Sequence, residues 1–282
     1  MSFYNSGFCF LNNKILPVNK AKVKIFDLAL IRSYGVFDYL RTYNGHPFLI
    51  KEHFQRFQNS ANGLGLTIPL NFNEIENVIN ELLVKNSYHE AGIRLVLTGG
   101  YSNDGYTPCG NSNFFILIND FVANEPKIQE KGISLITCNH KRELPYIKSL
   151  NYLTGIKQIN AIKNSGASEV LYVCGGLVYE CARNNIFLIK DNCLITPYND
   201  VLPGTRRNLL LEILKNKFKI ELRNVKVAEL WSSDEIFITS TTKEVLSVVK
   251  IDNIKIGTGK PGKSTKLIQK IFRKYVQAKS VK

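Results

Sequence analysis

The sequence predicts a two-domain chain of mixed α+β / α/β class, and three observations support this. The chain has 282 residues, 44% of them hydrophobic and 21% charged, a balance typical of a packed globular protein. Helical and strand-like hydrophobic patterns follow one another along it. The polar, proline-containing stretch 122–126 interrupts these patterns. We therefore expect domains over 1–121 and 131–282, joined by a linker over 122–130.

In the first domain, the spacing of apolar residues predicts a helix over 51–62 and a second helix after Asn73. Phe54, Phe57 and Ala61 share one helical face in the first of these, and a glycine ends it. Short apolar runs predict strands over 23–26, 93–98 and 114–119.

In the second domain, strands and helices alternate more closely. Strands are expected over 133–137, 169–173, 186–189, 235–239 and 245–249. Helices are expected over 152–163, 206–217 and 263–278.

The net charge of +14 suits a nucleic acid, an anionic surface or an acidic small molecule, without choosing among them. We interpret the lysine-rich stretch 260–282 as a solvated helix face, and the absence of a nucleic-acid reader motif predicts no nucleic-acid partner. The apolar run 114–118 is far shorter than the ~18 residues of a membrane span. The N-terminus does not resemble a signal peptide. We therefore expect a cytoplasmic protein without a membrane partner.

Two other patterns are interpreted as non-functional. The six cysteines form no C-x-x-C pair and the four histidines are far apart in sequence, so no metal site is expected. Residues 257–264 match the phosphate-binding pattern G-x-x-x-x-G-K-[ST]. Pro261 removes one N–H donor from that loop, and only 18 residues follow Ser264. A glycine-rich turn into a terminal helix is the simpler interpretation.

The most informative residue is Lys148, which ends an apolar stretch just before a predicted helix and could form a Schiff base there. Further segments lie around it in order: 35–45 (GVFDYLRTYNG), 52–56 (EHFQR), 177–187 (LVYECARNNIF), 201–207 (VLPGTRR) and 237–245 (FITSTTKEV). With them, the chain resembles the class IV aminotransferases, which are two-domain fold-type IV enzymes of the D-amino-acid aminotransferase-like fold. The resemblance implies pyridoxal 5'-phosphate as cofactor, amino-acid and 2-oxo-acid substrates, and a homodimer.

The resemblance also implies the roles of residues around the cofactor. Lys148 matches the lysine that binds the cofactor and moves the substrate proton, and Glu180 matches the carboxylate that faces the pyridine nitrogen. The remaining matches are Arg56, Thr205, Arg206 and Thr241 at the phosphate, Leu202 on the ring, and Tyr152 at the phenolic oxygen. Threonine is common in the family where this chain has Arg206, which puts the role of that side chain in doubt.

The amino-acid substrate is less constrained by the sequence. The loop 99–108 has no Arg-x-His pair of the kind found in well-known D-amino-acid transaminases. Arg41 and Thr242 match substrate-binding positions of branched-chain aminotransferases, and Phe37 belongs to the same N-terminal motif as Arg41. Arg32 and Arg94 interrupt apolar stretches, and their partners could be substrate carboxylates or structural acids.

We expect a pyridoxal-phosphate-dependent aminotransferase that acts on a D-amino acid and a 2-oxo acid such as 2-oxoglutarate. A branched-chain L-amino-acid aminotransferase and an aminodeoxychorismate lyase are the alternatives.

Overall fold

The computed structural model describes residues 7–123 and 125–280, and its contacts divide the chain into two compact units. Unit 1 contains the chain up to Val122 together with Ile147–Asn151, and unit 2 contains Ala123–Tyr146 and Tyr152–Lys279. The sequence analysis placed Lys148 in the second domain, whereas its contacts put it in unit 1. The reason is backbone pairing between Lys148 and an N-terminal strand, which sequence periodicity does not reveal.

Unit 1 is built on an antiparallel sheet, which has six strands among the described residues. The strands are β1 (Phe8–Leu11), β2 (Lys14–Pro17), β3 (Gly35–Tyr43), β4 (His46–Pro47), β5 (Ala91–Thr98) and β6 (Phe114–Asp120), in the spatial order β2-β1-β6-β5-β3-β4. The predicted strands 93–98 and 114–119 are therefore confirmed as β5 and β6.

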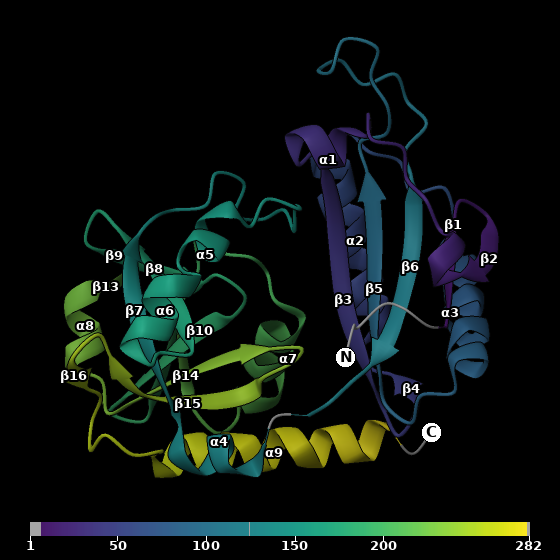
Figure 1. The fold of residues 1–282 in the computed structure, drawn as a ribbon. Coiled ribbons are helices and arrows are strands. Elements are labelled where there is room, and N and C mark those ends of the chain that lie inside the picture. Colours follow the sequence, from purple (N-terminus) through teal and green to yellow (C-terminus); the bar gives the residue numbers. More distant parts are fainter. Residues whose placement is uncertain (1–6, 124, 281–282) are drawn as a thin grey trace. The chain divides into compact units, whose positions relative to one another are not determined.

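The helices of unit 1 include α1 (Leu28–Arg32), α2 (Ile50–Gly63) and α3 (Phe72–Asn86), and a short 3-10 turn covers Val18–Lys20. Figure 1 shows α2 running along the sheet formed by β3, β5 and β6. Phe57 of α2 and Leu40 of β3 are fully buried in a shared core. Helix α3 begins one residue earlier than predicted because Asn71 and Glu74 form a capping box at its start.

The predicted strand over 23–26 is wrong. These residues form no strand, and Val23, Ile25 and Phe26 are between 40% and 68% exposed. The chain turns there, with the Asp27 amide donating to the Lys24 carbonyl, and the Asp27 carboxylate then caps α1. An apolar alternation without a partner strand cannot satisfy its backbone groups as a strand.

Residues 147–151 extend the sheet of unit 1 beside β3. The Phe37 amide donates to the Lys148 carbonyl at 3.0 Å, and the Leu150 amide donates to the Gly35 carbonyl at 3.0 Å. Val36 and Ser149 form an antiparallel bridge. This pairing fixes the backbone of Lys148 against the start of β3.

Unit 2 contains a ten-stranded mixed sheet among the described residues. Its strands are β7 (Ile133–Asn139), β8 (Glu169–Cys174), β9 (Leu177–Cys181), β10 (Asn185–Lys190), β11 (Cys193–Pro197), β12 (Lys219–Arg223), β13 (Val225–Lys226), β14 (Glu235–Ser240), β15 (Glu244–Ile251) and β16 (Ile254–Lys255). Strands β7, β8 and β15 pair in parallel, as do β11 and β12, and the other pairs are antiparallel. All five strands predicted for this region are confirmed.

The helices of unit 2 are α4 (Pro126–Lys131), α5 (Leu153–Lys157), α6 (Ile159–Ser165), α7 (Thr205–Leu214), α8 (Val227–Trp231) and α9 (Lys263–Lys279). The stretch predicted as a linker therefore contains α4, with Pro126 in its first turn, where the missing N–H is tolerated. The helix predicted over 152–163 is divided at Gln158 into α5 and α6.

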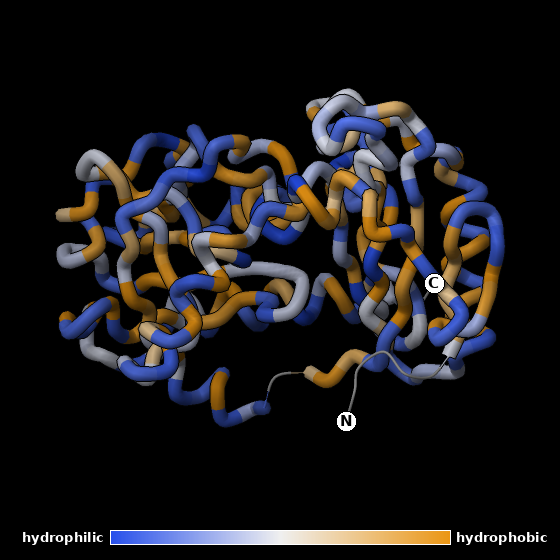
Figure 2. Tube along the Cα trace, turned by 45° about the horizontal axis from the view of Figure 1, so that its top comes forward, coloured by the Kyte–Doolittle hydropathy of each residue, from blue (hydrophilic) through white to orange (hydrophobic). Residues whose placement is uncertain are grey.

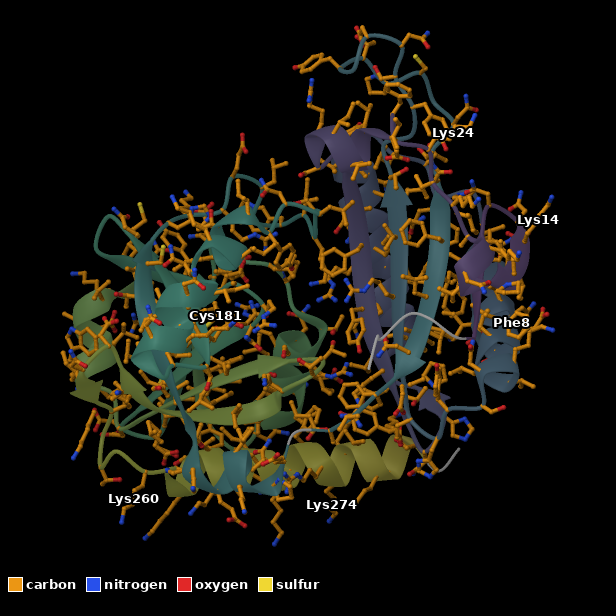
Figure 3. The ribbon with its side chains drawn as sticks, viewed as in Figure 1. Phe8, Lys14, Lys24, Cys181, Lys260 and Lys274 are labelled. Atoms are coloured by element: carbon orange, nitrogen blue, oxygen red, sulfur yellow. The ribbon has the colours of Figure 1, made fainter. Side chains whose placement is uncertain are left out.

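The apolar residues of each unit gather along its strands and inward helix faces, as the hydropathy colouring in Figure 2 shows. Helix α9 packs its buried residues Ile268, Phe272 and Val276 toward β14 and β15. Lys274, on the exposed side of α9, points away from the sheet (Figure 3).

The glycine-rich segment before α9 wraps a carboxylate rather than forming an open phosphate loop. Glu235 accepts hydrogen bonds from the Ser264 amide at 2.9 Å and from the Thr265 amide and hydroxyl at 2.7 Å each. A Cβ atom at Gly262 would lie 2.0 Å from the Glu235 carboxyl carbon. The match to a nucleotide-binding motif is thus explained by the capping of a terminal helix.

Candidate active site

Lys148 is held by backbone contacts on both sides of its peptide. Its amide donates to the hydroxyl of Ser60, a fully buried residue of α2, at 3.1 Å, and its carbonyl accepts from Phe37. The ammonium nitrogen lies 4.5 Å from the centre of the Phe37 ring. The lysine is therefore anchored by its main chain, and its amine lies over an aromatic side chain.

Arg94 of β5 faces the same ring. Its guanidinium carbon is 5.6 Å from the centre of Phe37 and 5.5 Å from that of Tyr39. Phe37 and Tyr39 alternate along β3 with buried core residues, so they project from the face opposite the core. Among the described residues, Arg94 has no ion pair with a carboxylate. Lys148 and Arg94 thus place two positive charges against one aromatic ring.

Arg56 lies on the core side of β3, where it pairs with Asp38. Its Nε and one terminal nitrogen, Nη2, donate to the two carboxylate oxygens of Asp38, each at 2.8 Å, and His53 Nδ1 lies 2.7 Å from Asp38. Burial opposes the Asp38 charge, but Arg56 and His53 outweigh it and hold the pKa of this carboxyl well below its usual range. The network fixes the Arg56 guanidinium at one side.

Arg41 and Arg32 have different surroundings. The buried guanidinium of Arg41 is sandwiched between the rings of Tyr43 and Phe121, at 4.0 and 3.9 Å, and its Nε donates to the Thr42 carbonyl. Arg32 is exposed at the end of α1 and donates to the Ile31 carbonyl. Within the described residues, the structure records no contact between Arg32 and the other predicted site residues.

In unit 2, the centre of the predicted site is Glu180 of β9. Its Oε1 accepts from Arg142 at 3.0 Å, and its Oε2 accepts from the Leu202 amide at 3.1 Å and from Asn185 Nδ2 at 3.2 Å. The carboxylate is 4% exposed. Three donors from separate segments therefore fix its orientation.

The start of α7 is built around a glycine. Gly204 precedes the helix, and no side chain caps the helix start. A Cβ atom at Gly204 would lie 2.0 Å from Asn185 Oδ1, so only glycine fits beside this amide. Thr205 and Arg206, which follow, are 6% and 1% exposed. The first-turn amides of such a helix form a favourable site for an anion.

The other predicted residues of unit 2 lie on separate elements. Thr241 is buried in the turn after β14, and Thr242 is exposed next to it, with its hydroxyl 3.4 Å from that of Ser240. Tyr152 occupies the position before α5, and its carbonyl accepts from the Ile156 amide. Leu202 is tied by its backbone to Glu180 and Asn185.

The matching family model, described as amino-transferase class IV, covers residues 35–251. The chain belongs to this family. A protein of Methanocaldococcus jannaschii, provisionally named a branched-chain-amino-acid aminotransferase, is 33% identical over 94% of each chain. The D-alanine aminotransferase of Staphylococcus haemolyticus is 32% identical over 96% of this chain and 98% of its own.

Solved structures of this class also share the fold. The branched-chain amino acid aminotransferase of Escherichia coli superimposes with a TM-score of 0.89 at 26% identity, over 95% of this chain and 94% of its own. A second branched-chain enzyme, from T.th. and solved with pyridoxamine 5'-phosphate, gives the same TM-score and identity over 96% and 94%. The expected fold class is therefore confirmed, and the protein is a pyridoxal-phosphate-dependent transaminase of class IV. Within the described residues, none of the helices has the length and hydropathy to cross a membrane.

The sequence analysis of this class IV aminotransferase missed several residues that support the predicted site. Asp38 and His53 hold Arg56, Arg142 and Asn185 hold Glu180, and Ser60 holds the backbone of Lys148. Strand alternation offers one signal, because it places Asp38 between Val36 and Leu40 on the core face, where a carboxylate needs a partner. Arg142, Asn185 and Ser60 carry no such signal, since their contacts join segments distant in sequence.

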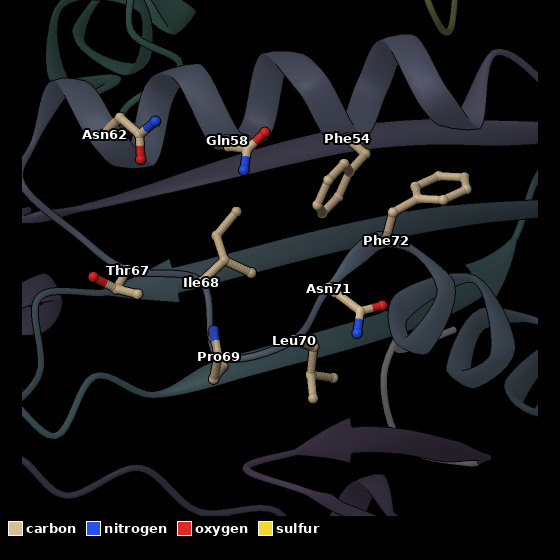
Figure 4. A pocket seen from close by; sticks show the side chains of 9 residues that line it. All are labelled: Phe54, Gln58, Asn62, Thr67, Ile68, Pro69, Leu70, Asn71 and Phe72. Atoms are coloured by element: carbon tan, nitrogen blue, oxygen red, sulfur yellow. The ribbon is translucent and has the colours of Figure 1, made fainter.

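A cavity of about 350 Å³ lies elsewhere in unit 1, between α2 and the segment leading into α3 (Figure 4). Its lining includes Phe54, Ile68 and Phe72 and none of the predicted site residues. This cavity is therefore separate from the lysine that defines a transaminase.

Proposed function

We propose that this aminotransferase binds pyridoxal 5'-phosphate and moves an amino group between a D-amino acid and a 2-oxo acid such as 2-oxoglutarate. The observation that carries the proposal is the charged face of unit 1, where Lys148 and Arg94 lie against Phe37. Every transaminase substrate has an α-carboxylate, and a guanidinium can bind a carboxylate through two parallel hydrogen bonds. Arg94, which pairs with no carboxylate among the described residues, has the chemistry for that role.

The residues of unit 2 fit a phosphorylated pyridine. We assign the phosphate to the backbone amides of Thr205 and Arg206 and to the Thr241 hydroxyl, because a helix start without a side-chain cap attracts an anion. We assign the pyridine nitrogen to Glu180, whose carboxylate is oriented by three donors. When bound, the cofactor supplies an electron-withdrawing ring that stabilises negative charge at the substrate Cα.

Two further roles belong to residues of unit 1. The Lys148 amine acts as the nucleophile toward the cofactor aldehyde and as the base that moves the proton at the substrate Cα. Arg56 is assigned to the phosphate, and its pairing with Asp38 limits its rotation, which lowers the entropic cost of binding an anion. Leu202 on the cofactor ring and Tyr152 at the phenolic oxygen complete the proposed set.

The preference for D-amino acids has support from the relatives, since several of them, at 30–32% identity over nearly the whole chain, are named D-alanine aminotransferases. A branched-chain L-amino-acid aminotransferase is the second candidate. It is favoured by the branched-chain enzymes among the solved structures, which superimpose with a TM-score of 0.89. In that case we expect Arg41 and Thr242 to contribute to substrate binding.

We further propose that the chain acts as a homodimer in the cytoplasm. Supporting the dimer, Ile25, Phe26 and Leu30 in unit 1 are 65–69% exposed, and large apolar side chains gathered on a surface are typical of protein contacts. Arg32 lies just after these residues and could bind a substrate carboxylate from the interface. Sedimentation velocity tests the assembly: a monomer at micromolar concentration would contradict it.

The function is tested with purified protein supplied with pyridoxal 5'-phosphate. We expect a visible absorption band that is lost in Lys148→Ala, and amino transfer from D-alanine or D-glutamate to a 2-oxo acid. Activity confined to L-leucine, L-isoleucine and L-valine would select the branched-chain alternative. Release of pyruvate from aminodeoxychorismate without a 2-oxo acid would select a lyase.

The role of Arg94 is tested in the same assay. We expect Arg94→Leu to raise the KM for the amino acid at least tenfold, which corresponds to the ~1.5–3 kcal/mol of a charge-assisted hydrogen bond. The matched control is Arg273→Leu, since Arg273 is an exposed arginine of α9. An unchanged KM in Arg94→Leu would reject the assignment.

A further inference from the structure

The residue behind Glu180 is Arg142, from the segment that follows β7. Its Nη1 donates to Glu180 Oε1 at 3.0 Å, and its side chain is 13% exposed against 4% for Glu180. The pair is therefore largely shielded from solvent, and a charge in such surroundings acts strongly on its neighbour.

The other Glu180 oxygen contacts neutral donors. Oε2 accepts from the Leu202 amide and from Asn185 Nδ2, while Asn185 also donates to the Leu202 carbonyl at 2.9 Å. These contacts orient the carboxylate but supply no net charge. Arg142, by contrast, brings a full positive charge into direct contact with Glu180.

A second arginine, Arg207 of α7, lies farther from this carboxylate. Its Nη2 donates to the Pro197 carbonyl, and it forms no ion pair with Glu180 within the described part of the chain. Burial lowers the pKa of Arg207, and the charge of Glu180 partly opposes that effect. Of these two arginines, Arg142 is therefore the one that stabilises the Glu180 anion directly.

We infer that Arg142 is a positioning residue that keeps Glu180 ionised, so that the shared proton resides on the pyridine nitrogen of the cofactor rather than on the carboxylate. This inference rests on the proposed function, in which Glu180 faces that nitrogen. Without a neighbouring cation, a buried carboxylate and a pyridinium can both become neutral by moving one proton, because burial penalises both charges. With Arg142 in contact, the neutral acid is disfavoured. Arg142 thereby sets how strongly the ring withdraws electrons.

The structure supplies a control for this pair. Arg183 Nε donates to Glu169 Oε2 at 2.9 Å, and Glu169 is also 4% exposed at its side chain. It is likewise an arginine on a buried carboxylate of unit 2, but none of the proposed roles involves it. Arg183→Gln therefore removes an arginine from a buried carboxylate without touching Glu180.

The test is the nitrogen-15 NMR shift of the pyridine nitrogen in protein loaded with nitrogen-15-labelled pyridoxal 5'-phosphate, followed over pH. We expect a protonated nitrogen at neutral pH in the wild type and in Arg183→Gln. In Arg142→Gln, the pH at the midpoint of its titration should fall by about 1–3 units, the usual effect of a neighbouring opposite charge. Arg142→Lys, which keeps a cation, should recover at least half of that fall.

Each outcome bears on one of the two claims. A wild type that does not bind the cofactor would overturn the proposed function. A wild type that binds it with an unprotonated nitrogen, or an Arg142→Gln midpoint within about 0.3 units of wild type, would overturn the inference alone, since a neighbouring charge should move it further. If Arg142→Gln does not fold by circular dichroism, Arg142→Lys decides: its ammonium is a less directional donor, so a midpoint between those of wild type and Glu180→Gln supports the inference, and one equal to either rejects it.

Discussion

The network of Asp38, His53 and Arg56 should govern both the stability of unit 1 and its dependence on pH. Asp38→Asn keeps the size of the side chain but leaves the buried Arg56 guanidinium opposite a neutral amide. Breaking a buried ion pair by removing one charge costs about 3–5 kcal/mol. Because asparagine keeps one acceptor oxygen, we expect a loss of about 3 kcal/mol at pH 7, the lower end of that range.

The pH dependence follows from the lowered pKa of Asp38 in the folded protein. The unfolded chain binds a proton near pH ~3.9, so the stabilisation by Asp38 is complete above that pH and declines as the pH falls toward the folded value. The difference between wild type and Asp38→Asn should therefore narrow by about 1 kcal/mol between about pH 7 and pH 3.

Urea unfolding followed by circular dichroism measures this difference, and hydrogen exchange of α2 and β3 locates it in unit 1. Asp120→Asn, an exposed aspartate of the same sheet, is the control and should change stability by less than about 0.5 kcal/mol. A loss in Asp38→Asn below about 1 kcal/mol at pH 7, or a difference that does not narrow in acid, would refute the reasoning.

Three other substitutions test separate features. Glu235→Gln weakens the hydrogen bonds at the start of α9 and should lower the free energy of unfolding by about 2–3 kcal/mol; an unchanged melting temperature would argue against capping by this carboxylate. Gly204→Ala forces Asn185 to move and should weaken pyridoxal-phosphate binding at least tenfold in equilibrium dialysis, whereas equal affinity would show that the close approach is not required. Ser60→Ala leaves the buried Lys148 amide without its acceptor at a cost of about 1–3 kcal/mol, which thermal unfolding should detect unless the segment shifts to another partner.

The segment 257–264 shows how a local pattern can have more than one structural origin. Glycines and a lysine before a helix are required by a phosphate loop, but the same residues suit any close approach of an acidic group to a helix start. Here that group is Glu235, on a strand 22 residues or more before the pattern. The acceptor that occupies a helix start is invisible to a motif search.

The sequence by itself determined the family, the long helices and the central strands, because hydrophobic periodicity and ordered motifs are local properties. Residues 114–120 read as a strand since their alternation suits a half-buried sheet, and the Lys148 segment was recognisable from its neighbours in the chain. The apolar run at 23–26 misled for the opposite reason, since a strand needs a partner and its own residues do not say whether one exists.

Only the tertiary structure decided which residues support the predicted ones. It placed Lys148 beside β3, gave Arg56 its partner Asp38, and brought Arg142 to Glu180 across 38 positions of sequence. Such contacts join groups of opposite charge or matching donors and acceptors. Many pairings in one chain would satisfy that chemistry, and only the fold selects among them.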